Sequence, residues 1–504
     1  MELVKRGFGS NKITQDDLTI GASDIFSIPS YLDNFTEWDD ICFSADGLSD
    51  ENGPYKFTIS SNDTQYISLN NIICVMKLAL VNENDEAIHE TDDQAFFLPN
   101  IASSIFETIK FDINGRPVAD LTQDEYGYKS YIEHLLSYSD KSLGDVLSSR
   151  LMLPDPPGLW SIPAGPRGFS YSRKGLYQLA ADKVKAATPA VKVPPDTGVV
   201  VIPARAAITT ETVDERNKYM KGSIWDRWTY ATLAPDHSGF RVATPLSIDW
   251  FGADRLLPPN TSLNIIFRKK PKEFYLLIPP DRPKGNDVKL KIVDFKLKVA
   301  YQTLAPQLRQ EHEEKFNKGL SAIIPYQQIA IKRRAFPAGL SDLSFDYCIT
   351  GDIPKQMLIL MINSKAYDGD FALSPFAFHH YDMESCSLRV NNRMVPNEPI
   401  KCDFGQFDYA EQYLYFHKNI GLDALESSSM VSYTAYLTDY TMMAFDLTPD
   451  KCNGHHLHRL KNGTVDVKVV LKKRLTEPIT MLVLCTYDKM LKLNKTREAV
   501  VTNI

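Results

Sequence analysis

The sequence predicts an all-β protein built from two consecutive antiparallel sandwiches, each with a short helical insertion. Two observations indicate this fold: short segments of alternating apolar residues recur along the chain, and one hairpin-and-helix pattern occurs twice. The first copy begins with Phe111-Asp-Ile-Asn-Gly-Arg-Pro-Val118, and the second begins 277 residues later with Leu388-Arg-Val-Asn-Asn-Arg-Met-Val395. Apolar alternation interrupted by Asn-Gly or Asn-Asn is typical of a β-hairpin.

The repeat extends beyond the two turns. A tyrosine-rich helix is expected behind each hairpin, and the same offset pairs Tyr138 with Tyr415 without a gap. A second match pairs Leu263 to Lys269 with Val467 to Lys473 at an offset of 204, so about 73 additional residues lie between the matched blocks of the first copy. Two matches in the same order favour a duplicated domain. The structural repeat residues are Asn114, Gly115, Arg116 and Gly144 in the first copy, and Asn391, Asn392, Arg393 and Gly421 in the second.

The first sandwich is expected over residues 24–305, after an N-terminal arm at 1–23 that has no apolar periodicity. Its clearest strand runs from Val288 to Tyr301, where the alternation slips by one residue at Val293 and indicates a β-bulge. Nine prolines fall within residues 151–205, a density that disfavours long helices and central strands. We therefore expect a long surface insertion at about 151–222.

The second unit is expected over residues 306–504, where a charged linker helix from Pro306 to Leu320 precedes the second sandwich. Two local patterns make finer predictions in the first half. Thr122-x-x-Glu125 predicts a capping box at the start of the first hairpin helix, and Phe274 to Ile278 predicts a strand. The helix side chains expected to be buried are Tyr131, Ile132, Tyr409 and Tyr413.

Composition excludes several classes of protein. A hydrophobic content of 43% with 24% charged residues is ordinary for a globular protein of 504 residues. The apolar runs are too short to span a bilayer, and the first residues lack the apolar stretch of a secretory signal. Seven cysteines without a Cys-x-x-Cys pair indicate reduced thiols. The net charge of −7 argues against general affinity for nucleic acid, so no sequence-specific nucleic-acid partner is expected.

No catalytic, cofactor-binding or metal-binding residue is assigned from motifs. The sequence contains no Gly-x-Ser-x-Gly, Walker A or Gly-x-Gly-x-x-Gly element. One loop, with Cys452, His455, His456 and His458, has side chains that bind Zn²⁺ in other proteins. Its spacing fits no standard ligand set, so a polar loop between strands is the favoured interpretation. A sandwich-fold carbohydrate-active or metal-binding protein stays open as the alternative.

The segment Tyr440-Thr-Met-Met-Ala-Phe-Asp-Leu-Thr-Pro-Asp450, followed by Gly454 and a histidine-containing loop, resembles the major capsid protein of Polinton/Maverick elements and adintovirus-like viruses. The resemblance continues in Phe111 to Arg116, in Lys289 to Tyr301 and in Asp368 to Tyr381. It covers most of the chain outside 1–23 and 151–222. The Ala-Phe-Asp-Leu-Thr-Pro-Asp motif is fairly specific, whereas the strand patterns are not.

The resemblance implies two tandem antiparallel jelly-roll sandwiches of the tectivirus and adenovirus lineage. It further implies a structural protein without enzymatic activity, whose homotrimers form pseudo-hexagonal capsomers that tile an icosahedral shell. Neighbouring capsomers, penton proteins and minor capsid proteins would be its partners. The protein would be made in the host cytoplasm, assembled there or in the nucleus, and located in the virion capsid.

Overall fold

The computed structural model describes residues 34–48, 53–82, 84–86, 95–139, 142, 146–155, 227, 239–278, 288–422, 429–451 and 461–503. The expected N-terminal arm and most of the proline-rich insertion lie outside these ranges. Gly144 and the loop with Cys452, His455, His456 and His458 also lie outside them.

The first half of the chain forms two facing antiparallel sheets. One has the order β1-β11-β3-β8 and consists of β1 (Phe35–Ser44), β11 (Lys289–Leu304), β3 (Gln65–Val81) and β8 (Phe240–Pro245). The other has the order β2-β9-β5-β6 and consists of β2 (Tyr55–Ser60), β9 (Ser262–Lys269), β5 (Phe106–Ile113) and β6 (Arg116–Pro117), with β7 (Gln123–Asp124) also paired to β5. A small separate sheet joins β4 (Phe96–Phe97) to β10 (Leu276–Leu277).

The second half repeats this topology. One sheet has the order β12-β19-β14-β17 and consists of β12 (Ala322–Phe336), β19 (Ile479–Leu493), β14 (Gln356–Asn363) and β17 (Met442–Asp446), with β20 (Ala499–Asn503) paired to β19. The other has the order β13-β18-β15-β16 and consists of β13 (Asp342–Asp352), β18 (Asn462–Leu471), β15 (Met383–Val390) and β16 (Arg393–Lys401). Strand for strand, β1 corresponds to β12, β5 to β15, β9 to β18 and β11 to β19.

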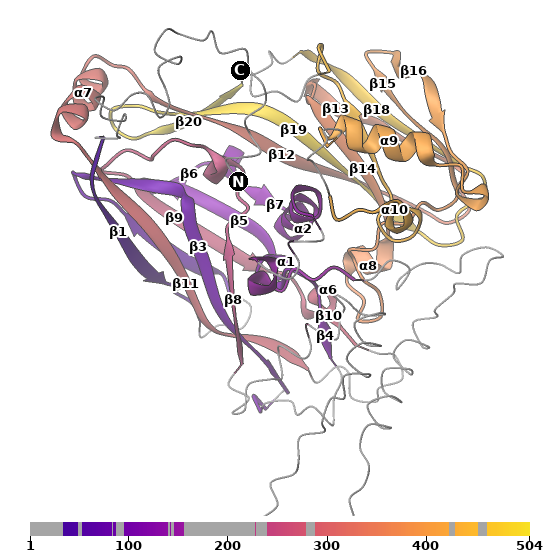
Figure 1. Ribbon diagram of the computed structural model, residues 1–504, viewed down its shortest axis with the longest axis horizontal. Helices are drawn as coiled ribbons and strands as arrows, with labels where there is room; N and C mark the ends of the chain where they lie inside the picture. Colours follow the sequence, from indigo (N-terminus) through magenta and orange to yellow (C-terminus); the bar gives the residue numbers. More distant parts are fainter. Residues whose placement is uncertain are drawn as a thin grey trace, which may run out of the picture.

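Short helices fill the connections between strands. The α-helices are α1 (Ile101–Ser104), α2 (Tyr126–Ser137), α6 (Lys272–Tyr275), α7 (Pro306–Asn317), α8 (Ser364–Asp368), α9 (Ala410–Asn419) and α10 (Tyr433–Leu437). The 3₁₀ turns are η2 (Ala119–Leu121), η4 (Val146–Arg150), η5 (Asp249–Gly252) and η7 (Phe404–Gln406). In Figure 1, α2 lies in the middle of the molecule and α9 lies over the second half. None of these helices has the length and apolarity needed to cross a membrane.

The core explains the strand assignments. Strand β2 alternates strictly between buried and exposed positions, and Phe57 packs edge-on against Phe267 of the neighbouring strand β9 and Phe295 of β11 in the facing sheet. In β11 the pairing with β3 shifts between Ile292 and Asp294, where the slip in the sequence predicts a bulge. Buried apolar residues form one continuous cluster that includes both halves. The all-β prediction of two antiparallel sandwiches with inserted helices is therefore confirmed.

Three local predictions are wrong. Thr122 forms no capping box, because Glu125 takes the position before α2 in a left-handed conformation and makes no side-chain cap hydrogen bond. Phe274 belongs to the short helix α6, and only Leu276–Leu277 pairs as a strand.

The gapless alignment of the two helices also fails. Tyr138 lies just after α2, whereas Tyr415 lies within α9, so the two helices do not begin and end at matched positions. The unequal strands β6 and β16 precede them and account for the displacement. The proposed division of the chain at residues 305 and 306 stays a prediction.

Candidate functional site

The two hairpin turns of the repeat have the same backbone geometry. Asn114 and Gly115 join β5 to β6 with φ angles of 51° and 73°, and Asn391 and Asn392 join β15 to β16 with φ angles of 47° and 66°. Two consecutive residues with positive φ define a type I′ turn, whose twist matches that of the flanking strands. Asn and Gly tolerate this conformation better than other residues, which explains their presence in both copies.

Each turn is also attached to the neighbouring strand by its first asparagine. The backbone N–H of Asn114 donates to the carbonyl of Ser262 (2.8 Å), and the N–H of Ser262 donates to Oδ1 of Asn114 (2.7 Å). In the second copy, Asn391 donates to the carbonyl of Thr464 (2.9 Å), and the N–H of Thr464 donates to Oδ1 of Asn391 (2.9 Å). We call each pair of hydrogen bonds an asparagine clamp. The clamps fix the hairpin tip against β9 and β18, respectively.

The other repeat residues have individual roles. Gly421 follows α9 with a φ of 79°, and its N–H donates to the carbonyl of Lys418 (3.1 Å), while Leu422 donates to His417 (2.9 Å). This pair of bonds is a Schellman motif that ends the helix. Arg116 forms an exposed ion pair with Glu498 of the second half. Arg393 is exposed in its hairpin, and no shared function of the two arginines is visible.

Helix α2 is the centre of the contact between the two halves. Tyr131 is buried and its ring stacks on Phe376, with centroids 4.1 Å apart and planes at 5°. Tyr128 stacks in the same way on Tyr367 at 5.8 Å. Farther along the helix, the N–H of Met430 donates to the carbonyl of Leu135 (3.0 Å). Side chains from the second half therefore cover the face of α2 that the first half leaves open.

Polar groups complete this contact. Glu125 accepts from Lys270 (2.7 Å) within the first half, and it also accepts from the hydroxyl of Tyr367 in the second half. Burial, together with the adjacent Glu125 carboxylate, raises the pKa of Tyr367, so its hydroxyl stays protonated and acts as the donor. Arg333 of β12 lies beside Glu125 and Tyr367, and its guanidinium is 3.7 Å from the Glu125 carboxylate.

A buried ion pair lies beside this group. Lys129 of α2 and Asp249 of η5 are 2.5 Å apart and almost fully buried. The second oxygen of Asp249 accepts from the backbone N–H of Ile329 in β12 (3.1 Å), so the pair is joined to the second half. Removing one member of such a pair leaves the other charge buried without compensation. The two halves are thus packed with apolar, polar and ionic contacts along one side of β12.

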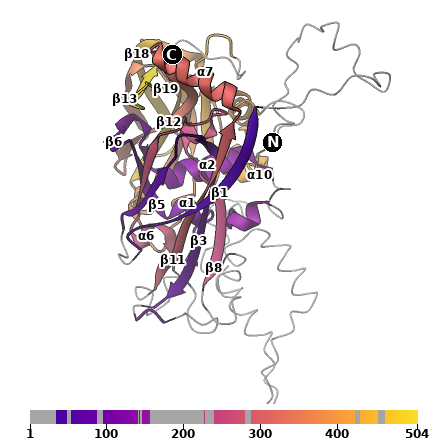
Figure 2. The same ribbon diagram turned by 90° about the vertical axis from the view of Figure 1, so that its left-hand side faces the viewer.

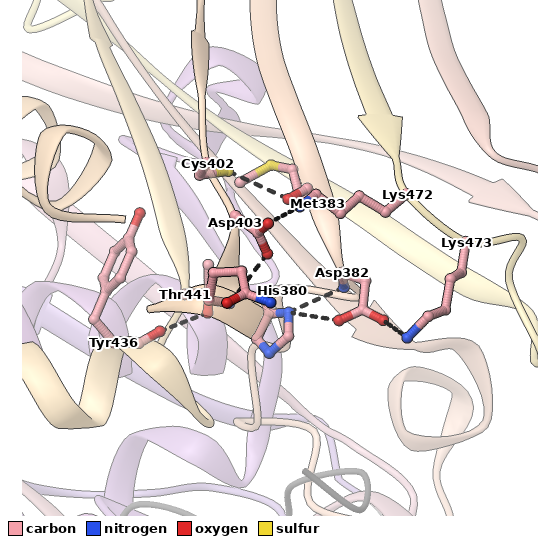
Figure 3. Close-up of polar contacts among 10 residues, drawn as sticks. His380, Asp382, Met383, Cys402, Asp403, Tyr436, Thr441, Lys472 and Lys473 are labelled. Carbon is pink, nitrogen blue, oxygen red and sulfur yellow. Dashed lines mark hydrogen bonds and ion pairs between the residues drawn. The ribbon is translucent and has the colours of Figure 1, made fainter. Parts of the chain in front are cut away.

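A second polar cluster lies at one end of the sheet that contains β15, β16 and β18 (Figure 3). Nδ1 of His380 accepts from the backbone N–H of Asp382 (3.0 Å), and the Asp382 carboxylate pairs with Lys473 at 2.9 Å. Lys472 pairs with Asp403, and the thiol of Cys402 donates to the carbonyl of Met383 (3.3 Å). Met383 begins β15, Cys402 follows β16 and Lys472 follows β18. These contacts therefore fasten three strand ends together.

The cluster contains histidine, cysteine and carboxylate, yet its geometry is that of a structural site. Burial raises the pKa of the Cys402 thiol to about 12, which opposes formation of a nucleophilic thiolate. Burial lowers the pKa of His380 to about 4, and its ring stacks on Phe404 at 4.3 Å. Among the described residues, no group of three or more His, Cys, Asp or Glu is placed to hold a metal ion.

Comparison with known proteins gives relatives of low sequence identity. No family model matches the sequence. An uncharacterized protein of Caenorhabditis elegans is 21% identical over 464 residues, which cover 90% of this chain and 94% of that protein. The similarity therefore extends over nearly the whole length of both chains.

Three solved structures that resemble this chain are of virus proteins. A chain of the Sputnik virophage structure has a TM-score of 0.57 at 12% identity, and the match covers 95% of this chain and 91% of that chain. Our protein therefore has a double jelly-roll fold. The VP54 protein of PBCV-1, fitted into a reconstruction of the virophage Sputnik, has a TM-score of 0.50 at 9% identity, with 95% and 99% of the two chains covered. The Faustovirus major capsid protein matches at 0.49 and 8% identity, with 95% and 94% covered.

The double jelly roll accounts for the sheet orders. Each half contains two facing sheets, one of four strands and one of five because β7 or β20 is added, and the orders β1-β11-β3-β8 and β12-β19-β14-β17 are equivalent. The sequence match of Leu263 to Lys269 with Val467 to Lys473 falls on the equivalent strands β9 and β18, but it is two residues out of register, because Ile265 pairs with Phe111 where Val467 pairs with Leu388. The hairpin match falls on the equivalent pairs β5–β6 and β15–β16.

Sequence reasoning identified the turns of both clamps but missed the clamps themselves and the contact centred on α2. The partner of each clamp, Ser262 or Thr464, is more than 70 residues away from its asparagine. The Glu125 pairs with Lys270 and Tyr367 are separated by 145 and 242 residues. The Thr122-x-x-Glu125 pattern drew attention to Glu125 for a different reason, and nothing else in the sequence indicates these partners.

Proposed function

We propose that this chain is a major capsid protein whose homotrimers form pseudo-hexagonal capsomers that tile an icosahedral virus or virus-like shell. The observation that carries the proposal is the presence, in one chain, of two sandwiches with the same sheet order. Three copies around a threefold axis would present six similar blocks, and a six-cornered unit tiles a flat facet. Differences between the halves reduce the sixfold arrangement to a threefold one.

The rigid packing of the two halves supports this role. A capsomer must keep its two blocks at a fixed angle, and two contacts between the halves oppose rotation: the stacked rings of Tyr131 and Phe376, and the hydrogen bond from the N–H of Ile329 to the buried carboxylate of Asp249. The similarity to a chain of the Sputnik virophage particle supports the same role. Neighbouring capsomers, penton proteins and minor capsid proteins are the proposed partners, and the virion capsid is the proposed location.

A trimer of this kind requires a heterologous interface that closes into a ring. An obligate interface is expected to bury upwards of about 2,000 Å² with an apolar centre. The protein in this proposal acts as a building block without catalytic activity, in agreement with the structural character of the His380 and Cys402 cluster.

Electron microscopy of the purified full-length protein tests the proposal. We expect three-lobed or hexagonal particles, and lattices or closed shells at raised concentration or salt. Uniform small particles with the dimensions of one chain under all these conditions would contradict it. Specific binding to a carbohydrate panel, together with such monomers, would favour the carbohydrate-active alternative.

A further inference from the structure

We propose that His134 and Arg150 form an acid-sensitive latch, which holds residues 146–155 on helix α2 and loosens when His134 gains a proton. The proposal goes beyond the capsid role and does not depend on it. We call residues 146–155 the root segment, because they consist of η4 and the residues that lead into the proline-rich insertion. Figure 1 and Figure 2 both show α2 in the middle of the molecule.

Two hydrogen bonds determine which ring nitrogen of His134 carries the proton. Nδ1 lies 2.6 Å from the carbonyl oxygen of Ser130, one helical turn earlier, and a carbonyl oxygen can only accept. Nδ1 is therefore the donor, and Nε2 has the lone pair. Nη1 of Arg150 lies 2.8 Å from Nε2, and a guanidinium can only donate, so Nε2 accepts from it. The neutral imidazole thus satisfies both partners at once.

A protonated His134 cannot keep both hydrogen bonds. Its Nε2 would carry a hydrogen and part of a positive charge, and it would point at the positive guanidinium of Arg150. Both side chains are buried, so water screens the repulsion poorly. Among the described residues, Arg150 and the phenol of Tyr138 are the charged and titratable groups that face the ring. Burial, together with Arg150, accordingly lowers the pKa of His134 to about 4.

Arg150 depends on His134 for its position. Its Nη1 also donates to the hydroxyl of Tyr138 (3.2 Å), and its guanidinium lies 5.4 Å from the centre of the Tyr138 ring. Its Nε is buried and has no hydrogen-bond partner among the described residues. Losing the bond to His134 would leave a poorly satisfied cation in a buried site, which is unfavourable. We therefore expect the guanidinium to move toward water and to loosen the end of η4.

Loosening of η4 affects a contact with the second half. The N–H of Met152 donates to the carbonyl of Leu147 (3.1 Å), which joins η4 to the rest of the root segment. At the end of this segment, the carbonyl of Asp155 accepts from the hydroxyl of Tyr440 in the second half (2.7 Å). The Asp155 carboxylate pairs with Arg227, which follows the insertion in the sequence (2.6 Å). The latch therefore lies at the base of the insertion, beside the contact between the two jelly rolls.

The second half contains a matched histidine that faces no cation. In α9, Nδ1 of His417 lies 3.1 Å from the carbonyl oxygen of Tyr413, again one turn earlier, and Nε2 lies 3.1 Å from the hydroxyl of Ser429. A hydroxyl can accept as well as donate, so a protonated His417 keeps both hydrogen bonds. Acid should therefore loosen the root segment after α2 but not the segment 419–422 after α9.

Hydrogen–deuterium exchange of the full-length protein, measured by mass spectrometry of its peptides at about pH 7.5 and about pH 5, tests the latch. After correction for the intrinsic effect of pH on exchange, peptides with Leu151 and Met152 should exchange about 10- to 30-fold faster at the lower pH. This factor follows from a His134 pKa of about 4 in the closed latch and 6.5 in the open one. Because closing lowers the pKa, the latch is intact above pH 6.5 and is lost as pH falls toward 4.

Three variants separate the latch from other effects of acid. His134→Gln removes the titrating ring and keeps an oxygen that can accept from Arg150, and Arg150→Gln removes the cation. The acid response of the root segment should disappear in both. His417→Gln is the matched control and should keep the wild-type response. Circular dichroism would verify that each variant keeps the wild-type fold.

Two results would overturn the latch. One is an equal acid response in the root segment and in the segment 419–422 of the wild type, and the other is a wild-type response that persists in His134→Gln or Arg150→Gln. The comparison of the two segments needs no variant, so it decides the question even if a substitution prevents folding. None of these results depends on the oligomeric state, so the latch and the proposed function can fail separately.

Discussion

Replacing Asn391 by alanine should destabilise the second jelly roll by about 2 kcal/mol. The N–H of Thr464 loses its 2.9 Å acceptor, and an intramolecular hydrogen bond contributes about 1 kcal/mol net. Alanine at a φ of 47° adds strain of about 1 kcal/mol, because its Cβ crowds the backbone in the left-handed region. The two effects are separable, since Asn391→Gly removes the acceptor without introducing strain and should cost about 1 kcal/mol. Asn391→Asp keeps an acceptor and should change stability little.

Gly463 offers an independent probe of the same clamp. A Cβ on this residue would lie 2.1 Å from Oδ1 of Asn391, so Gly463→Ala must displace the asparagine side chain. The expected loss is again about 1 kcal/mol, the value of the displaced hydrogen bond. Once Asn391 is glycine there is no side chain to displace, and Gly463→Ala should then cost almost nothing. The double-mutant cycle should therefore give a coupling of about 1 kcal/mol.

Urea denaturation at fixed protein concentration measures these free energies, since the transition of an oligomer depends on concentration. Additive effects of Asn391→Gly and Gly463→Ala, within about 0.3 kcal/mol, would refute the coupling. Equal losses for Asn391→Ala and Asn391→Gly would refute the assignment of strain to the positive φ.

Three further predictions concern other parts of the fold. Tyr131→Ala should lower the free energy of unfolding by about 3–5 kcal/mol in calorimetry, because a buried ring stacked on Phe376 is lost; a change below about 0.5 kcal/mol would contradict its role. Gly421→Ala should cost about 1 kcal/mol in urea denaturation because its φ is 79°, whereas the control Gly252→Ala, with open space around its Cβ and no positive φ, should be near neutral. Burial lowers the pKa of His380 to about 4 from its usual 6.5, so between pH 4 and pH 6.5 the unfolded chain binds more protons than the folded chain. Tm should therefore fall as pH decreases through this range, and it should fall less steeply in His380→Gln than in the wild type.

The sequence predicts the local features well because they depend on neighbouring residues. The Asn-Gly and Asn-Asn turns need only positive φ at two positions, and the bulge of β11 is visible as a slip in apolar alternation at Val293. The expected burial of helix side chains is confirmed for Tyr131, Ile132 and Tyr409, the last of which directly precedes α9, while Tyr413 is only partly buried. Each of these signals lies within one element of the chain.

Features that depend on distant partners escape the sequence. Strand β1 contains Glu37, Asp39 and Asp40 and has no alternating apolar pattern in its sequence. It forms a strand because it pairs with β11, which is more than 240 residues away. Glu125 resembles a capping residue locally, but its carboxylate binds Lys270 and Tyr367 instead. Partners 145 and 242 residues away leave no mark on the local pattern, so the contact between the jelly rolls could not be anticipated.

The mass of the wild-type protein in solution tests the central claim most directly. Sedimentation velocity or multi-angle light scattering across a range of dilutions should give a species near three times 57.0 kDa that persists at low micromolar concentration. A closed heterologous ring of three chains predicts this value. A stable monomer at micromolar concentration, with no larger species at raised salt or protein concentration, would contradict the capsomer and the function proposed from it.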